Sequence, residues 1–147
     1  MKEVRSLTVG TELDPEWKWD DKYPLAQIRQ IGELLFISGQ VPLNREGDLI
    51  GEGDVREQTR QVFKNIEELL GLYGRTIDNL FKVTAYLTDA ALFKAYNDAR
   101  EEVLKDHRPT STTVVVSSLA MKGLVVEVDA IAWLNSSPRA IAPGKSA

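Results

Sequence analysis

The sequence has no cysteine and one histidine in 147 residues. Without thiols the chain forms no disulfide, uses no thiolate nucleophile and holds no cysteine-ligated zinc. No apolar run approaches the length of a membrane span, and the first residues, Met1–Arg5, lack the apolar core of a signal peptide. We therefore expect a cytoplasmic protein that does not enter a membrane.

Positive charge is also scarce, with 18 Lys and Arg against 22 Asp and Glu and a net charge of −4. Proteins that bind polyanions need a clustered cationic face, so we expect no nucleic-acid partner. The ten glycines form neither of the phosphate-binding patterns G-x-G-x-x-G and G-x-x-x-x-G-K-[ST]. The lone His107, close to Pro109, is expected to cap a helix or to lie on the surface, because a zinc site needs three or four ligands.

The length and the 43% hydrophobic content suit one globular domain. We place this domain at residues 1–135, with residues 1–24 as an N-terminal extension that packs on it and residues 136–147 as a small-residue tail. Trp17 and Trp19 in the extension are expected to pack against the domain, or to form a wall or lid over a pocket.

Hydrophobic periodicity predicts an α/β (α+β) fold in the order β-hairpin, α, β, α, β-hairpin. The predicted elements are a hairpin over 25–31 and 34–38, a helix from Asp54 to Gly74, a strand over 80–87, a helix from 88–89 to about 107, and a hairpin over 108–116 and 124–130. Right-handed crossovers would make the linked strands parallel, in a mixed sheet with two helices on one face. Strands such as 34–37 and 125–128 are apolar on both faces, so we expect a homo-oligomer that covers the open face.

Glu127 interrupts the valine-rich last strand, where a carboxylate is costly to bury unless it is paired or useful. Burial would raise its pKa and suit it to general acid/base chemistry on a water molecule. Alternatively, Glu127 and Asp129, which point to the same face, line an exposed surface. The neutral hydrogen-bonding residues that could orient a small polar ligand nearby are Ser38, Asn97, Ser111, Thr112 and Thr113.

Several segments together resemble the RidA or YjgF family of reactive-intermediate deaminases, over roughly residues 25–134. They are Phe36-Ile37-Ser38-Gly39-Gln40-Val41-Pro42, Gln58 with Asn65, residues 83–89 with Phe93 and Asn97, Pro109, and Glu127-Val128-Asp129-Ala130. The resemblance implies a chorismate-mutase-like fold, a homotrimer formed through the open sheet face, and small-ligand clefts between subunits. It also implies hydrolysis of enamines and imines, such as 2-aminoacrylate, to 2-keto acids and ammonia, without a metal or an organic cofactor.

The resemblance assigns roles to single positions. Glu127 matches the catalytic glutamate that handles the attacking water, and Asn97 matches a helix asparagine of the substrate site. Ser38 and Gly39 match a pocket-lining turn, and the family's pocket-closing tyrosine falls on Leu25, two residues after Tyr23.

The family's substrate-clamping arginine falls on Ser111 in the segment Pro109-Thr110-Ser111-Thr112. Because an arginine–carboxylate pair contributes about 1.5–3 kcal/mol, we expect 2-imino acids to be poor substrates unless Arg108 or Arg29 replaces it. An alternative function is therefore a non-catalytic metabolite-binding or regulatory trimer. A ribonuclease activity, sometimes attached to the family, fits poorly with an acidic chain that has one histidine.

Overall fold

The computed structural model describes residues 4–6 and 9–135, so the tail predicted at 136–147 lies outside the described residues. The described part contains seven strands and two α-helices, with short 3-10 turns at 20–22, 77–79 and 90–92. In chain order the main elements are β1 (Val4–Ser6), β2 (Thr11–Leu13), β3 (Ile28–Ile31), β4 (Leu34–Gln40), α1 (Val55–Leu72), β5 (Leu80–Leu87), α2 (Phe93–Leu104), β6 (Thr110–Val115) and β7 (Val126–Trp133).

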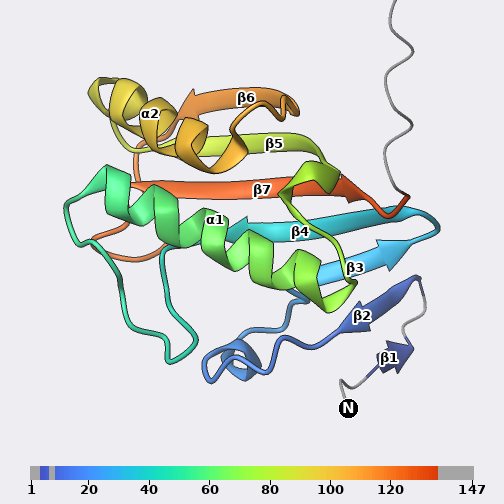
Figure 1. The fold of residues 1–147 in the computed structure, drawn as a ribbon. Coiled ribbons are helices and arrows are strands. Elements are labelled where there is room, and N and C mark those ends of the chain that lie inside the picture. The colour runs from blue at the N-terminus through green and yellow to red at the C-terminus, as the bar shows by residue number, and fades with distance from the viewer. Residues whose placement is uncertain (1–3, 7–8, 136–147) are drawn as a thin grey trace, which may run out of the picture.

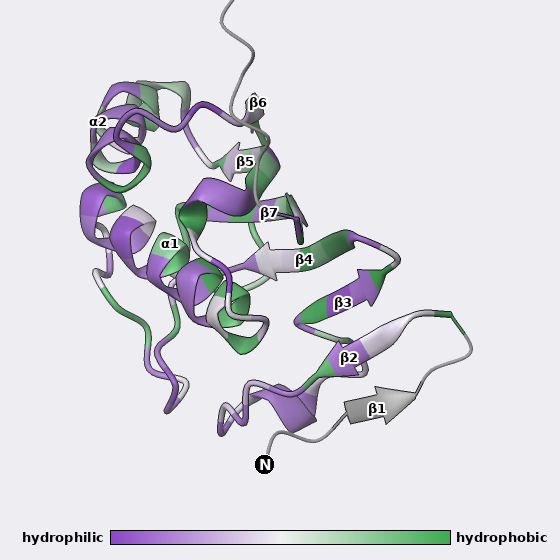
Figure 2. Cartoon of the chain, turned by 45° about the vertical axis from the view of Figure 1, so that its right-hand side comes forward, coloured by the Kyte–Doolittle hydropathy of each residue, from purple (hydrophilic) through white to green (hydrophobic). Residues whose placement is uncertain are grey.

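One mixed sheet holds all these strands in the order β1-β2-β3-β4-β7-β5-β6. Strands β5 and β6 are parallel, and the other neighbouring pairs are antiparallel. Both helices lie on one face of the sheet (Figures 1 and 2). The predicted α+β architecture and the parallel crossover through α2 are thus confirmed.

The hairpin predicted at the end of the domain is wrong. Strand β5 lies between β6 and β7, so β6 pairs only with β5 while β7 pairs with β4 and β5. Every second residue of β7 is buried, whereas five of the six β6 residues are exposed. The more apolar strand thus takes the centre beneath α1 and β6 takes the edge, although the two are consecutive in sequence.

Helix α1 begins and ends as predicted. The Asp54 side chain accepts hydrogen bonds from the backbone nitrogens of Arg56 (2.9 Å) and Glu57 (3.1 Å), which caps the first turn. Gly74 has φ +66°, the left-handed conformation that ends many helices. The apolar stripe of α1, with Val62, Phe63, Ile66, Leu69 and Leu70, is fully buried in the core.

The face of the sheet away from the helices remains apolar and open. The strand over 34–37 was expected to be apolar on both faces, and in the single chain Leu34 is 38% exposed and Phe36 is 42% exposed on the open face. Phe81 and Val114 are also exposed. The alternation in β4, buried at Leu35 and Ile37, shows that only the helix-covered face forms the core.

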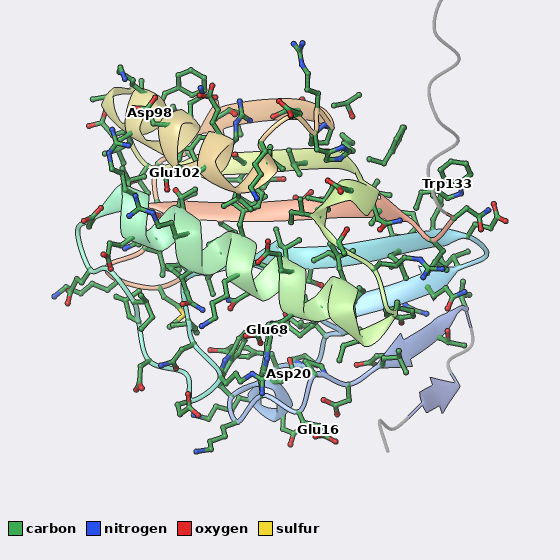
Figure 3. All side chains as sticks on the ribbon, in the orientation of Figure 1. Glu16, Asp20, Glu68, Asp98, Glu102 and Trp133 are labelled. Carbon is green, nitrogen blue, oxygen red and sulfur yellow. The ribbon has the colours of Figure 1, made fainter. Side chains whose placement is uncertain are left out.

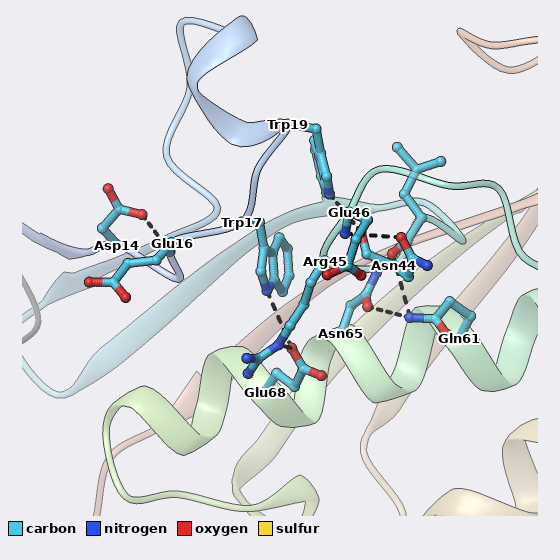
Figure 4. Close-up of polar contacts among 11 residues, drawn as sticks. Asp14, Glu16, Trp17, Trp19, Asn44, Arg45, Glu46, Gln61, Asn65 and Glu68 are labelled. Atoms are coloured by element: carbon cyan, nitrogen blue, oxygen red, sulfur yellow. Dashed lines mark hydrogen bonds and ion pairs between the residues drawn. The ribbon is translucent and has the colours of Figure 1, made fainter.

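The N-terminal extension packs on the domain through its tryptophans, as predicted. Trp17 and Trp19 are buried and stacked, with ring centroids 5.5 Å apart. Trp19 Nε1 donates to the carbonyl of Asn44 (2.8 Å), and Trp17 Nε1 donates to Glu68 on α1 (3.3 Å), as Figure 4 shows. Neither described α-helix combines the length and apolar character needed to cross a membrane.

Candidate functional site

Glu127 lies near the start of β7, on the side of the sheet away from α1, because Val126 and Val128 on either side of it face the core. It lines a pocket of about 260 Å³. The other lining residues are mostly apolar: Trp19, Tyr23, Leu25, Gln27, Gly39, Val41, Leu43, Ala120, Met121 and Leu124. We call this cavity the Glu127 pocket. It brings together three of the residues predicted from sequence, namely Glu127, Gly39 and Leu25.

Burial raises the pKa of the Glu127 carboxyl, and the negative charge of Asp129 raises it further. Asp129 itself accepts a hydrogen bond from the Tyr86 hydroxyl (2.9 Å), which keeps it on the same face. No described side chain forms an ion pair or a hydrogen bond with the Glu127 carboxyl. A carboxyl group in this environment accepts and returns protons at a higher pH than an exposed glutamate.

Gly39 is required by the position of Glu127. A Cβ atom at residue 39 would overlap Oε1 of the Glu127 side chain, which crosses over the glycine. Next to it, the Ser38 hydroxyl donates to the carbonyl of Ala26 (2.6 Å). Ser38 therefore ties β4 to the segment before β3 and shapes the pocket edge without lining the cavity.

Gln27, Trp19 and Tyr23 are pocket residues that the sequence reasoning did not assign to the site. Gln27 is 2% exposed; its Nε2 donates to Asp20 (2.6 Å), and its Oε1 accepts from Gln40 (2.8 Å). The two tryptophans in the extension were a sequence signal for either packing or a pocket wall, and Trp19 does both. No feature of the sequence marked Gln27 as a pocket residue, because its contacts form only when the extension packs over it.

A second region forms between α2 and β6. It is a groove of about 630 Å³ lined by Asn97, Arg100, Glu101, Leu104, Lys105, Asp106, His107, Arg108, Pro109 and Ser111. We call it the α2–β6 groove. It contains the predicted residues Asn97 and Ser111, together with Arg108. Thr112 does not line the groove: it pairs with Thr84 of β5, so its side chain points to the opposite face from Ser111.

Arg100 links the two predicted residues of this groove. Its Nε (3.1 Å) and Nη2 (2.6 Å) both donate to Oδ1 of Asn97, and its Nη1 donates to Oγ of Ser111 (2.7 Å). The guanidinium carbon also lies 5.2 Å from the centre of the Tyr96 ring. Sequence reasoning proposed Arg108 and Arg29 as cations for the site and missed Arg100. Of the three, Arg29 lies away on β3, opposite Phe36.

His107, at the same end of the groove, donates from Nε2 to the carbonyl of Leu80 (2.7 Å), which anchors the end of the α2 segment to β5. The His107 ring is half-buried and contacts a strand carbonyl, so it has neither the helix-capping nor the surface position predicted from the sequence. Within residues 4–6 and 9–135, no three His, Asp or Glu side chains gather as a metal site would require.

The pocket and the groove are separate within one chain. Ser111 pairs with Val83, whereas Glu127 pairs with Tyr86, so the two lie two strands apart and three residues apart along β5. Two strand spacings correspond to about 10 Å across the sheet, and three residues correspond to about 10 Å along a strand. The side chains of Ser111 and Glu127 also point to opposite faces of the sheet. The expectation that Ser111 lies near Glu127 is therefore wrong within a subunit, because the predicted hairpin does not form and β5 separates β6 from β7.

Residues 21–134 match the profile of the family described as Endoribonuclease L-PSP. A RutC family protein of Pyrococcus horikoshii is 36% identical over 110 residues, which cover 75% of this chain and 86% of the relative. A Rid family protein of Yersinia pestis, YyfA, described as a protein of unknown function, is 38% identical and has a TM-score of 0.71; the match covers 75% of this chain and 87% of that one.

The structure of Escherichia coli TdcF with bound serine is also similar, with a TM-score of 0.70 and 28% identity, covering 76% of this chain and 88% of TdcF. The shared architecture is the chorismate-mutase-like fold of these proteins. The matches in sequence and structure agree with the segments that carried the resemblance. This chain therefore belongs to the Rid family, which includes the proteins named RidA, YjgF, RutC and L-PSP.

Proposed function

We propose that this protein is a cofactor-independent hydrolase of small enamines or imines, with Glu127 as the catalytic acid and base. The observation that carries the proposal is the environment of Glu127, a half-buried carboxyl with a raised pKa in a mostly apolar pocket. Membership of the Rid family supports the same class of chemistry. The proposal includes a cytoplasmic location.

The proposed reaction replaces a C=N bond by a C=O bond. The Glu127 carboxylate takes a proton from water as the water oxygen bonds to the carbon of the protonated imine, giving a carbinolamine. Glu127 then returns this proton to the amine nitrogen, and the C–N bond breaks as the hydroxyl proton passes back to the carboxylate. Glu127 then passes this proton to the departing ammonia, so the products are a carbonyl compound and ammonium and the carboxylate is restored. A positioned carboxyl that shuttles a proton in this way contributes about 10²–10⁴-fold in rate.

A homo-oligomer, which we propose to be a trimer, is part of this function. The exposed apolar side chains of the open sheet face, including Phe36 and Val114, suit burial against a second copy. A small substrate that contacts both Glu127 and Ser111 would also need two subunits, because the two residues lie apart on opposite faces of the sheet within one chain. Sedimentation at micromolar concentration tests this assembly, and a stable monomer would contradict it.

The expected ligand is a small metabolite of amino-acid type. The relative TdcF binds serine, and the family resemblance implies 2-amino or 2-imino compounds. Leu25 and Trp19 add apolar surface to the Glu127 pocket, which favours the uncharged part of such a molecule there.

The deciding experiment measures ammonia release from freshly generated 2-aminoacrylate and from imines with larger side chains. Glu127→Gln keeps the size of the side chain but cannot exchange the proton, so turnover should fall by about 10²–10⁴-fold. Glu46→Gln, the same change at an exposed position, is the matched control and should keep full turnover.

The alternative function, a non-catalytic metabolite-binding trimer, is favoured by Ser111 in place of the clamping arginine. It predicts that small ligands bind while no imine is turned over by the wild type. The same assay therefore separates the two functions, and equal turnover by wild type and Glu127→Gln would refute the role given to Glu127.

A further inference from the structure

Arg100 carries a charge that no described carboxylate neutralises. Its three hydrogen bonds go to the neutral oxygens of Asn97 and Ser111. The arginines of α1 are different: Arg56 pairs with Asp98 (2.9 Å) and Arg60 pairs with Glu102 (3.0 Å), the two α2 acids labelled in Figure 3. Arg100 is thus held in place without being neutralised.

Arg100 has more N–H donors than the hydrogen bonds to Asn97 and Ser111 use. A guanidinium has five N–H donors, and three of them are used here, one each on Nε, Nη1 and Nη2. One N–H therefore remains on each terminal nitrogen. Two parallel N–H groups on neighbouring nitrogens are the arrangement that binds a carboxylate through both of its oxygens.

The surroundings keep these two N–H groups available. Glu101 follows Arg100 directly, but its Oε1 accepts from Nδ2 of Asn97 (2.9 Å). The Asn97 amide thus stands between the carboxylate of Glu101 and the guanidinium of Arg100, with its NH₂ toward the first and its oxygen toward the second. The groove also holds Lys105 and Arg108 against a single further acid, Asp106.

We propose that the α2–β6 groove is a carboxylate-binding site in which Arg100 is the binding cation and Asn97 and Ser111 are its positioning residues. The carboxylate belongs to the substrate of the reaction proposed for Glu127, and this identification rests on that proposed function. The serine at position 111 then acts as an acceptor that orients an arginine from α2. The expectation that 2-imino acids are poor substrates, drawn from Ser111 alone, is replaced by the expectation that they are accepted.

The test measures binding in the Glu127→Gln background, where turnover does not interfere. Pyruvate is titrated into the protein and followed by NMR, with pyruvamide as the uncharged analogue. Arg100→Gln should weaken pyruvate binding about tenfold or more and leave pyruvamide binding unchanged. Arg60→Gln, which removes a surface arginine paired with Glu102, is the control and should bind pyruvate as its parent does.

Arg100→Lys separates binding from folding, because it keeps the charge and loses the planar fork. It should bind pyruvate with an affinity between those of the parent and Arg100→Gln, and thermal melts of the variants show whether the fold is kept. The proposal is overturned if the parent does not bind pyruvate, or if Arg100→Gln binds it as tightly as the parent. Neither result bears on the proton transfer by Glu127, which the ammonia assay tests on its own.

Discussion

The Glu127 pocket and the α2–β6 groove surround groups of opposite charge with different environments. The pocket surrounds one acid with apolar side chains, so its carboxyl gains a raised pKa. The groove surrounds Arg100 with neutral acceptors, so its guanidinium keeps its charge and two donors. A carboxyl group with a raised pKa suits proton transfer, whereas anion binding needs a group that is always charged.

Under the proposed function, neither region is a complete site on its own. Among the described residues, the pocket is lined by no arginine or lysine, and the groove lining does not include Glu127. Because they face opposite sides of one sheet, one subunit cannot apply both to a small molecule. The central claim is therefore that two subunits each supply half of one site.

After Glu127→Gln itself, the largest effect on the pocket should come from Gly39→Ala. The new Cβ overlaps Glu127 Oε1, so the carboxyl must move, and a misplacement of about 1 Å costs about 10²-fold in rate. Gly71→Ala in α1 is the matched control, because nothing lies within 4 Å of its Cβ and alanine favours the helix by about 0.5–1 kcal/mol. Steady-state rates of both variants check the prediction, and full activity of Gly39→Ala would contradict the placement of Glu127.

A smaller effect is expected from Asp129→Asn. Activity should rise with pH as Glu127 loses its proton, and the raised pKa puts this rise above the ordinary glutamate value of about 4.3. Removing the charge of Asp129 lowers the pKa of Glu127, while the new amide oxygen still accepts from Tyr86. The rise of kcat/KM should therefore shift to lower pH without vanishing. An unshifted profile would mean that Asp129 does not act on Glu127.

The raised pKa of Glu127 also affects the thermal stability of the protein. A carboxyl with a raised folded-state pKa contributes its stability below its unfolded pKa, and this contribution is lost as pH rises through the folded pKa. Glu127→Gln should therefore melt at a higher temperature than wild type at pH 7, and the difference should fade below about pH 4.3. Melting curves over this pH range test the sign, and a less stable variant at pH 7 would contradict it.

The smallest effect compares the two stacked tryptophans. Phenylalanine at either position loses one indole hydrogen bond, to Asn44 for Trp19 and to Glu68 for Trp17, so both variants should lose about 1 kcal/mol of stability. Only Trp19 lines the pocket, so only Trp19→Phe should change KM for substrates with apolar side chains, by a few-fold. Equal KM values in both variants would make Trp19 a packing residue alone.

The sequence predicted those parts of the fold that depend on local pattern. The cap at Asp54, the stop at Gly74 and the strand over 80–87 all agree with the structure, because capping, left-handed glycine and alternation act over a few residues. The pairing of the last two strands failed, since nothing in their sequences records that β5 lies between them.

The site residues also differ in whether local sequence or tertiary packing reveals them. Glu127 was predicted because a carboxylate in a valine-rich strand is conspicuous on its own. Arg100 was missed because arginines are common on exposed helix faces. Its role depends on the packing of α2 against β6, which the sequence alone does not show. Its spacing from Asn97 places the two on one helix face, but its contact with Ser111 exists only in the folded chain.

Mixing two impaired variants, assayed at a substrate concentration below KM, tests the shared site most directly. Glu127→Gln subunits keep Arg100, and Arg100→Gln subunits keep Glu127, so a site between subunits is intact wherever each supplies its unchanged residue. After unfolding and refolding an equal mixture, random assembly should restore about one quarter of wild-type activity. A mixture no more active than its two components, while wild type treated in the same way recovers fully, would contradict the account.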